Sequence, residues 1–126
     1  MSSAPGTALI LFVHGARDPR WAEPVERIQQ LLAMSVDPAV LVYAAFLEFM
    51  SPTLPELVAQ LALQQIIHIT VVPIFLGQGG HVRNDLPQLI RELQSRYPQI
   101  QFKLAPAVGE DPDVLAAIAD ACMRHL

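Results

Sequence analysis

The sequence predicts an α/β fold with a single four-stranded parallel sheet flanked by helices on both faces. Four short apolar runs, each bounded by turn residues, have the pattern of strands that are covered on both sides. The segments between them carry apolar residues at helical spacing. Strand and helix alternate along the chain, which favours parallel strands joined by crossover helices.

The first half of the chain holds two strand and helix pairs. The strand predicted at 8–13 ends at His14, and the apolar face of the following helix holds Trp21, Val25, Ile28 and Leu32. The strand at 40–47 precedes a helix that opens with a capping box formed by Thr53 and Glu56. The inward face of this second helix holds Leu54, Leu57, Val58 and Leu61.

The second half repeats the alternation. The strand at 66–76 contains Pro73, which removes a ladder hydrogen bond, so we expect a bend or bulge there. Asp85 can cap the next helix, with Pro87 in its first turn. A weaker strand at 101–105 leads to a helix opened by Asp111 and Pro112. The expected buried side of this last helix holds Val114, Ile118 and Ala121.

Length and composition indicate one domain over residues 1–126, since domains usually hold roughly 100 to 200 residues. Apolar residues make up 52% of the chain and charged residues only 16%, so we expect an apolar surface that a second copy covers. The net charge of -4 argues against nucleic-acid binding. Cys122, the only cysteine, is expected to be a buried thiol in the reducing cytoplasm. No apolar run is long enough for a signal peptide or a membrane span.

Polar side chains follow the predicted strands at the edge where parallel sheets bind ligands. His14 and Arg17 follow the first strand, Glu48 the second, and His81 and Arg83 the third. Glu48 interrupts an apolar segment, so its carboxylate needs a partner or a ligand. Two histidines and a carboxylate suit Co²⁺, Fe²⁺, Ni²⁺ or Zn²⁺ and leave coordination positions open, as a catalytic site requires. The alternative is that each histidine is a simple turn residue, and for His68, in mid-strand, we expect a place in the core or an interface.

The loop after the third strand is rich in glycine. It fits neither the dinucleotide-binding pattern nor the P-loop, so we expect no nucleotide. Glycines at 77, 79 and 80 would let the backbone come close to a flat ligand, or would let the loop flex. The alternative is a plain loop whose glycines adopt positive φ angles.

Three segments together resemble the small class II chelatases of the CbiX and SirB type. They are Leu-Phe-Val-His-Gly-Ala-Arg-Asp-Pro-Arg at 11–20, Phe-Leu-Glu at 46–48, and Val-Pro-Ile-Phe-Leu-Gly-Gln-Gly-Gly-His-Val-Arg-Asn-Asp-Leu-Pro at 72–87. Their order and spacing match that family over nearly the whole chain. Ala16 departs from the pattern, which has serine after His-Gly.

The resemblance implies a chelatase-like half domain that inserts a divalent metal into sirohydrochlorin or a related tetrapyrrole, in cobalamin or sirohaem biosynthesis. The metal is a substrate, Co²⁺ first and Fe²⁺ or Ni²⁺ as alternatives, and the reaction needs neither ATP nor an organic cofactor. Larger members hold two such halves in one chain, so the half-length chain is expected to form a homodimer.

The family's site residues carry over by position. His14 would be a proton acceptor and metal ligand, His81 the second metal ligand, and either Glu48 or a freed imidazole would accept pyrrole protons. Substrate contacts would come from Glu48 and from the loop residues Leu76, Gly77, Gln78, Gly79 and Gly80. The guanidinium groups of Arg17, Arg20 and Arg83 would pair with carboxylates around the macrocycle.

Two other functions stay open at this point. His14 and the arginines could serve phosphoryl transfer, but residue 13 is valine where the histidine phosphatase signature has arginine. A non-catalytic carrier of metal or tetrapyrrole would need the same residues as a chelatase. A metal-insertion assay distinguishes the carrier from the enzyme.

Overall fold

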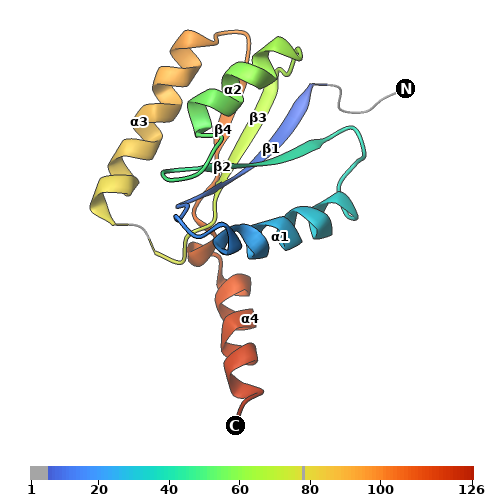
Figure 1. Ribbon diagram of the computed structural model, residues 1–126, viewed down its shortest axis with the longest axis vertical. Coiled ribbons are helices and arrows are strands. Elements are labelled where there is room, and N and C mark those ends of the chain that lie inside the picture. Colours follow the sequence, from blue (N-terminus) through green and yellow to red (C-terminus); the bar gives the residue numbers. More distant parts are fainter. Residues whose placement is uncertain (1–5, 78) are drawn as a thin grey trace.

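The computed structural model describes residues 6–77 and 79–126, apart from the side chain of His81, and contains one parallel four-stranded sheet (Figure 1). The strand order is β2-β1-β3-β4. Leu11 on β1 pairs with Ala44 on β2 and with Val72 on β3. The predicted fold class is therefore confirmed. The strands are β1 Thr7–Val13, β2 Leu41–Phe46, β3 His68–Pro73 and β4 Gln101–Leu104.

Helices follow each strand, as the alternation of patterns predicted. They are α1 Glu23–Ala33, α2 Leu54–Leu63, α3 Gly80–Arg96 and α4 Pro112–Met123, with short 3-10 helices η1 Pro19–Ala22 and η2 Val108–Glu110 before α1 and α4. The capping box at the start of α2 is present, with Thr53 and Glu56 each accepting a backbone hydrogen bond from the other. None of these described helices is long and apolar enough to cross a membrane.

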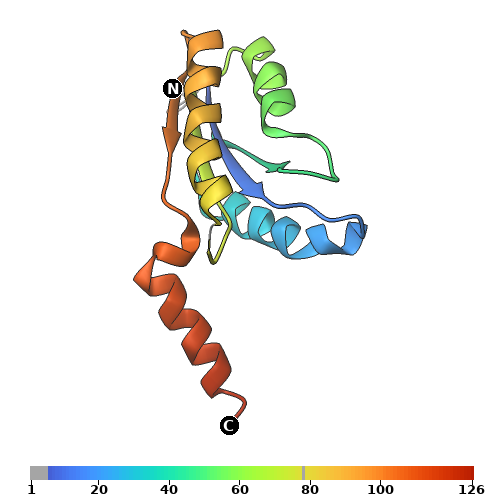
Figure 2. The ribbon, with the colours of Figure 1, turned by 90° about the vertical axis from the view of Figure 1, so that its left-hand side faces the viewer.

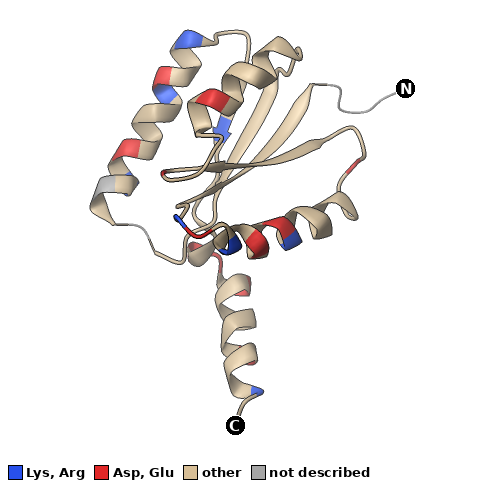
Figure 3. Cartoon of the chain, viewed as in Figure 1, with Lys and Arg blue, Asp and Glu red and all other residues tan. Residues whose placement is uncertain are grey.

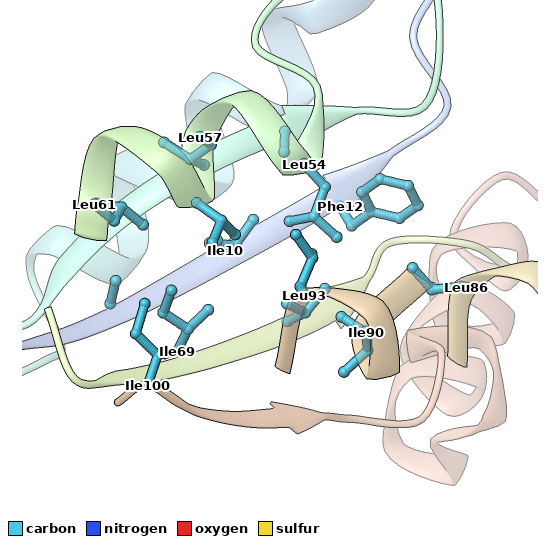
Figure 4. Packing of buried hydrophobic residues seen from close by; sticks show 14 of the residues in the cluster. Ile10, Phe12, Leu54, Leu57, Leu61, Ile69, Leu86, Ile90, Leu93 and Ile100 are labelled. Carbon is cyan, nitrogen blue, oxygen red and sulfur yellow. The ribbon is translucent and has the colours of Figure 1, made fainter. Parts of the chain in front are cut away.

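The main hydrophobic core lies between the sheet and the helices α2 and α3. Figure 4 shows its central side chains, which come from β1, α2 and α3: Ile10, Phe12, Leu54, Leu57, Leu61, Leu86, Ile90 and Leu93. A smaller cluster on the opposite face is built from β1, β2 and α1, with Leu11, Val13, Val25 and Phe46 at its centre. Helices therefore cover both faces of the sheet.

Two local expectations about proline are wrong. The parallel register continues regularly to Phe12 and Pro73, and Ile74 N–H then donates to the Phe12 carbonyl, so β3 ends at Pro73 without a bulge. The third helix begins at Gly80, not after Asp85, which places Pro87 inside it. A proline there deprives the Arg83 carbonyl of its helical donor, but the seven preceding residues are already helical and the helix continues through Pro87 to Arg96.

Two expected burials are also wrong. The fourth helix begins after the Asp111 cap as predicted, yet none of its residues is buried, because α4 extends away from the sheet in both views of the chain (Figures 1 and 2). Cys122 on α4 is consequently exposed. At the first position of β3, His68 is exposed, so its expected place in the core is wrong as well, while the alternative place in an interface stays a prediction.

Candidate functional site

His14 is the first residue after β1, and its side chain is exposed at the carboxyl edge of the sheet. Its imidazole packs on the ring of Phe75, with ring centroids 4.3 Å apart and planes inclined by 34°. Phe75 is only 3% exposed and meets the buried ring of Phe12 edge-on at 5.9 Å. This stack of rings holds the imidazole against the core while leaving it open to a ligand.

The loop after β2 lies directly beside His14. Leu47 N–H donates to the Val13 carbonyl at 2.8 Å, and Glu48 N–H donates to the His14 carbonyl at 3.0 Å. The two loops thus extend the strand pairing by two residues beyond the sheet. The expectation that strand ends bring His14 and Glu48 together is confirmed, and both side chains are exposed at this edge.

Gly15 makes the close approach of these loops possible. Its φ of +90° lies in the region that favours glycine, and a Cβ atom there would collide with the Glu48 carbonyl oxygen. A side chain at this position would push the Glu48 loop away from His14.

Gly15→Ala should therefore destabilise the chain by about 1 to 3 kcal/mol, the usual range for a non-glycine residue in a strained conformation. Thermal or denaturant unfolding measures this loss. Gly77→Ala is the matched control, because a Cβ at Gly77 meets nothing within 4 Å and should change stability little. Equal losses in the two variants would contradict the role given to Gly15.

Arg17 lies over the ring of Phe49, with its guanidinium carbon 4.9 Å from the ring centroid. Phe49 adopts a φ of 68°, which is costly for a bulky residue, and its side chain is 57% exposed. Sequence reasoning missed Phe49. The signal available was an aromatic residue directly after Glu48, in a segment already assigned to the ligand-binding edge.

The other two candidate arginines have different surroundings. Arg20 forms an ion pair with Asp18 at 2.7 Å, and this guanidinium lowers the pKa of the Asp18 carboxyl below its ordinary value. The same contact raises the pKa of Arg20, which is thus already paired. Arg83 lines a pocket of about 260 Å³ between α3 and the segment from β4 to η2, together with Glu110. No described contact places Arg83 beside Arg17.

An apolar groove lies between the loop after β2 and the first turns of α3. Its volume is about 180 Å³, below the roughly 300 to 1,000 Å³ of a typical ligand pocket. The residues that line it are Phe12, Leu47, Val82, Asp85, Leu86 and Leu89. The sequence did not predict this groove, because its α3 wall depends on where α3 begins.

The glycine-rich loop runs from β3 to α3. Leu76 is 67% exposed, and a Cβ built on Gly77, Gly79 or Gly80 would meet nothing within 4 Å. None of these three glycines has a positive φ, so the positive φ angles expected for a plain loop are wrong. The three glycines have open space beside them, which a ligand lying close to the loop backbone would need. Gln78 lies outside the described residues.

The metal-site prediction is not tested by the described part of the chain. His81 lies in the first turn of α3, but its side chain falls outside the described residues. Among the side chains that are described, no three from histidine, cysteine, aspartate and glutamate cluster closely enough to hold a metal ion. The two-histidine set of His14 and His81 stays a prediction.

The family model and the similar proteins of known function point to the same family. The CbiX family model matches residues 8–124. The sirohydrochlorin cobaltochelatase of Saccharolobus solfataricus is 30% identical over 112 residues, which cover 84% of this chain and 85% of the relative. The sirohydrochlorin ferrochelatase of Bacillus subtilis is 32% identical over 74 residues, but the match covers only 28% of that longer protein.

Solved structures agree with this assignment. A CbiX protein from Marinobacter aquaeolei VT8 superposes with a TM-score of 0.82 at 30% identity, covering 94% of this chain and 96% of that one. The chelatase SirB from Bacillus subtilis subspecies spizizenii, in complex with cobalt, superposes with a TM-score of 0.74 at 28% identity. This chain matches over 94% of its length there but spans only half of the SirB chain. The chain described above belongs to the CbiX family.

Proposed function

We propose that this protein is a sirohydrochlorin chelatase, which inserts Co²⁺, or Fe²⁺ or Ni²⁺ in its place, into a metal-free tetrapyrrole. The observation that carries the proposal is the exposed His14 imidazole, stacked on Phe75 and joined through the backbone to Glu48, in a chain that the CbiX model matches over residues 8–124. A structure of the related SirB was solved in complex with cobalt and another with Fe³⁺.

The reaction exchanges one divalent cation for two pyrrole N–H protons. An imidazole nitrogen of His14 binds the incoming metal ion, since neutral imidazole is a good ligand for all three metals. His81, on the first turn of α3, is the proposed second ligand. The two protons pass to Glu48 or to an imidazole that the metal has left, because one imidazole cannot bind metal and proton at the same nitrogen. Metal transfer and deprotonation thus occur at neighbouring side chains.

The surfaces around His14 suit a flat, largely apolar ring with acidic substituents. Three exposed apolar side chains, Leu47, Phe49 and Leu76, lie on the loops beside it. Gly77, Gly79 and Gly80 leave room for the macrocycle. Gln78, in the same loop, is proposed as a substrate contact from the resemblance alone. Arg17, held over Phe49, and Arg83, on α3, are the proposed carboxylate partners.

Arg17→Ala should mainly raise KM, by about five- to tenfold, because a rim contact with a carboxylate holds ground state and transition state alike. Steady-state kinetics of metal insertion separates KM from kcat. Arg91→Ala, which removes an exposed arginine from the middle of α3, is the control and should leave both constants near their normal values. A large loss of kcat at unchanged KM would remove Arg17 from the substrate rim.

The direct test of the proposed function is insertion itself. Purified protein is mixed with metal-free sirohydrochlorin and Co²⁺, Fe²⁺ or Ni²⁺ in parallel, without ATP, and the absorption change of the macrocycle is followed. Acceleration over the protein-free reaction supports the chelatase. Tight binding of the tetrapyrrole without acceleration would instead establish a carrier, and the metal with the largest kcat/KM identifies the preferred substrate.

We also propose a single chelatase-like domain over residues 1–126 that acts as a homodimer in the cytoplasm. A groove of about 180 Å³ is too small for a tetrapyrrole, so a second copy would complete the cleft. The chain spans half of the SirB chain that it matches.

A further inference from the structure

Phe49 is an unusual residue for the position that it occupies. Its backbone adopts a φ of 68°, in the left-handed region that favours glycine, and its side chain is 57% exposed. In the described part of the chain, Gln65 is the other non-glycine residue with a positive φ, and it directly follows the C-cap of α2, where this conformation is common. Phe49 lies at no helix end. Strained residues of this kind cluster at sites that bind ligands.

The loop from 47 to 52 imposes this backbone conformation. At its start, the N–H groups of Leu47 and Glu48 donate to carbonyls of the segment that ends β1. At its end, Phe46 N–H donates to the Pro52 carbonyl at 2.9 Å, so the chain leaves β2 and returns to it within six residues. Glycine or asparagine would adopt the left-handed conformation at lower cost. The fold alone therefore does not explain a phenylalanine at position 49.

Arg17 covers one face of the Phe49 ring, with its guanidinium carbon 4.9 Å from the ring centroid. Charged residues gather in the loop after β1, whereas Glu48 is the one charged residue of the loop from 47 to 52 (Figure 3). Arg20 in that first loop is paired with Asp18, but the described residues offer Arg17 no such ion pair. An exposed ring with an available cation beside it suits a ligand that is conjugated in its plane and anionic at its edge.

We propose that Phe49 is a stacking residue for the substrate, with its ring packed against the conjugated plane of the tetrapyrrole while Arg17 pairs with a carboxylate at the edge. This role, which rests on the proposed function, makes Phe49 the residue that favours a flat, conjugated substrate. Glu48, directly before Phe49, donates its N–H to the His14 carbonyl at 3.0 Å. A macrocycle bound at His14 therefore borders the loop that carries Phe49.

The other exposed apolar side chains beside His14 cannot take this role. Leu47 is 40% exposed and Leu76 67% exposed, so both offer apolar area to a ligand. Neither has a π face, and offset stacking of one flat ring on another needs two of them. The leucines thus add contact area, whereas Phe49 supplies the preference for a planar conjugated ring.

The test measures the binding of metal-free sirohydrochlorin by absorption titration, with no metal present. Phe49→Leu keeps an apolar side chain but removes the ring, Phe49→Asn places a residue that tolerates the left-handed conformation, and Phe49→Tyr keeps a ring. Leu63→Asn, which removes an 88% exposed leucine at the end of α2, is the matched control. Thermal unfolding of the same preparations shows whether each variant keeps its fold.

We expect Kd to rise about tenfold in Phe49→Leu and Phe49→Asn, and to stay within about twofold of normal in Phe49→Tyr and Leu63→Asn. The Tm of Phe49→Asn should be equal to or above that of the unaltered protein, because the backbone strain is relieved. Adding Arg17→Ala to Phe49→Leu should raise Kd by less than the product of the two single effects, since the cation and the ring act on the ligand together.

Normal binding by both Phe49→Leu and Phe49→Asn overturns the stacking role. A lower Tm in Phe49→Asn, with binding lost in proportion to the unfolded fraction, overturns it as well and assigns Phe49 to the stability of the loop. An unaltered protein that binds no sirohydrochlorin overturns this role and the proposed function together. Binding that depends on the Phe49 ring, in a protein that does not accelerate metal insertion, would support the stacking role and overturn the chelatase alone.

Discussion

Replacing His14 with alanine should lower the rate of metal insertion by at least about 100-fold, the loss typical of removing a group that transfers a proton. The effect is expected to be this large because His14 serves both as metal ligand and as proton acceptor in the proposed reaction. Its side chain is exposed and outside the hydrophobic core, so the fold should survive. The measurement is kcat for insertion with saturating metal and tetrapyrrole.

His68→Ala is the matched control for this result. His68 is also exposed, but it lies at the amino end of β3, at the opposite edge of the sheet. Its removal should leave insertion near the normal rate. If His14→Ala keeps most of its activity, or if His68→Ala loses as much, the reacting edge of the sheet has been wrongly assigned.

The residues at the carboxyl edge of the sheet were predictable, because each of them directly follows a strand that the sequence predicts. Any parallel sheet built from these runs brings His14 and Glu48 to one edge, and their backbone contact confirms it. The contact between His14 and Phe75 was not predictable, because it depends on how far β3 continues before the chain turns. The groove beside Leu47 was missed for a similar reason, since its α3 wall begins at Gly80 rather than after Asp85.

The error about α4 has a different physical origin. Helical periodicity shows which face of the helix is apolar, but it contains no information on where the helix lies relative to the sheet. The outward direction of α4 comes from the close contact between Gly109 and Leu76, residues 33 positions apart that no local pattern connects. Sequence periodicity therefore predicted the helix correctly and its burial in this chain wrongly.

Phe75→Ala should destabilise the chain by about 3 to 5 kcal/mol, the usual cost of removing a buried aromatic side chain, and should also slow metal insertion. Phe75 is 3% exposed, touches Phe12 at its edge and lies against the His14 imidazole. Its loss would open a cavity in the core and free the imidazole to rotate.

Phe75→Leu separates the two consequences, because leucine fills much of the space but offers no ring for His14 to stack on. We expect a smaller loss of stability than in Phe75→Ala, with kcat lowered several-fold at a temperature where the variant is fully folded. Phe102→Leu, which truncates a partly buried ring on β4, is the control for loss of packing alone and should leave kcat near normal. Denaturant unfolding and steady-state kinetics on the same preparations measure both effects. If Phe75→Leu and Phe102→Leu have the same kcat, the stacked ring stabilises the fold without positioning His14.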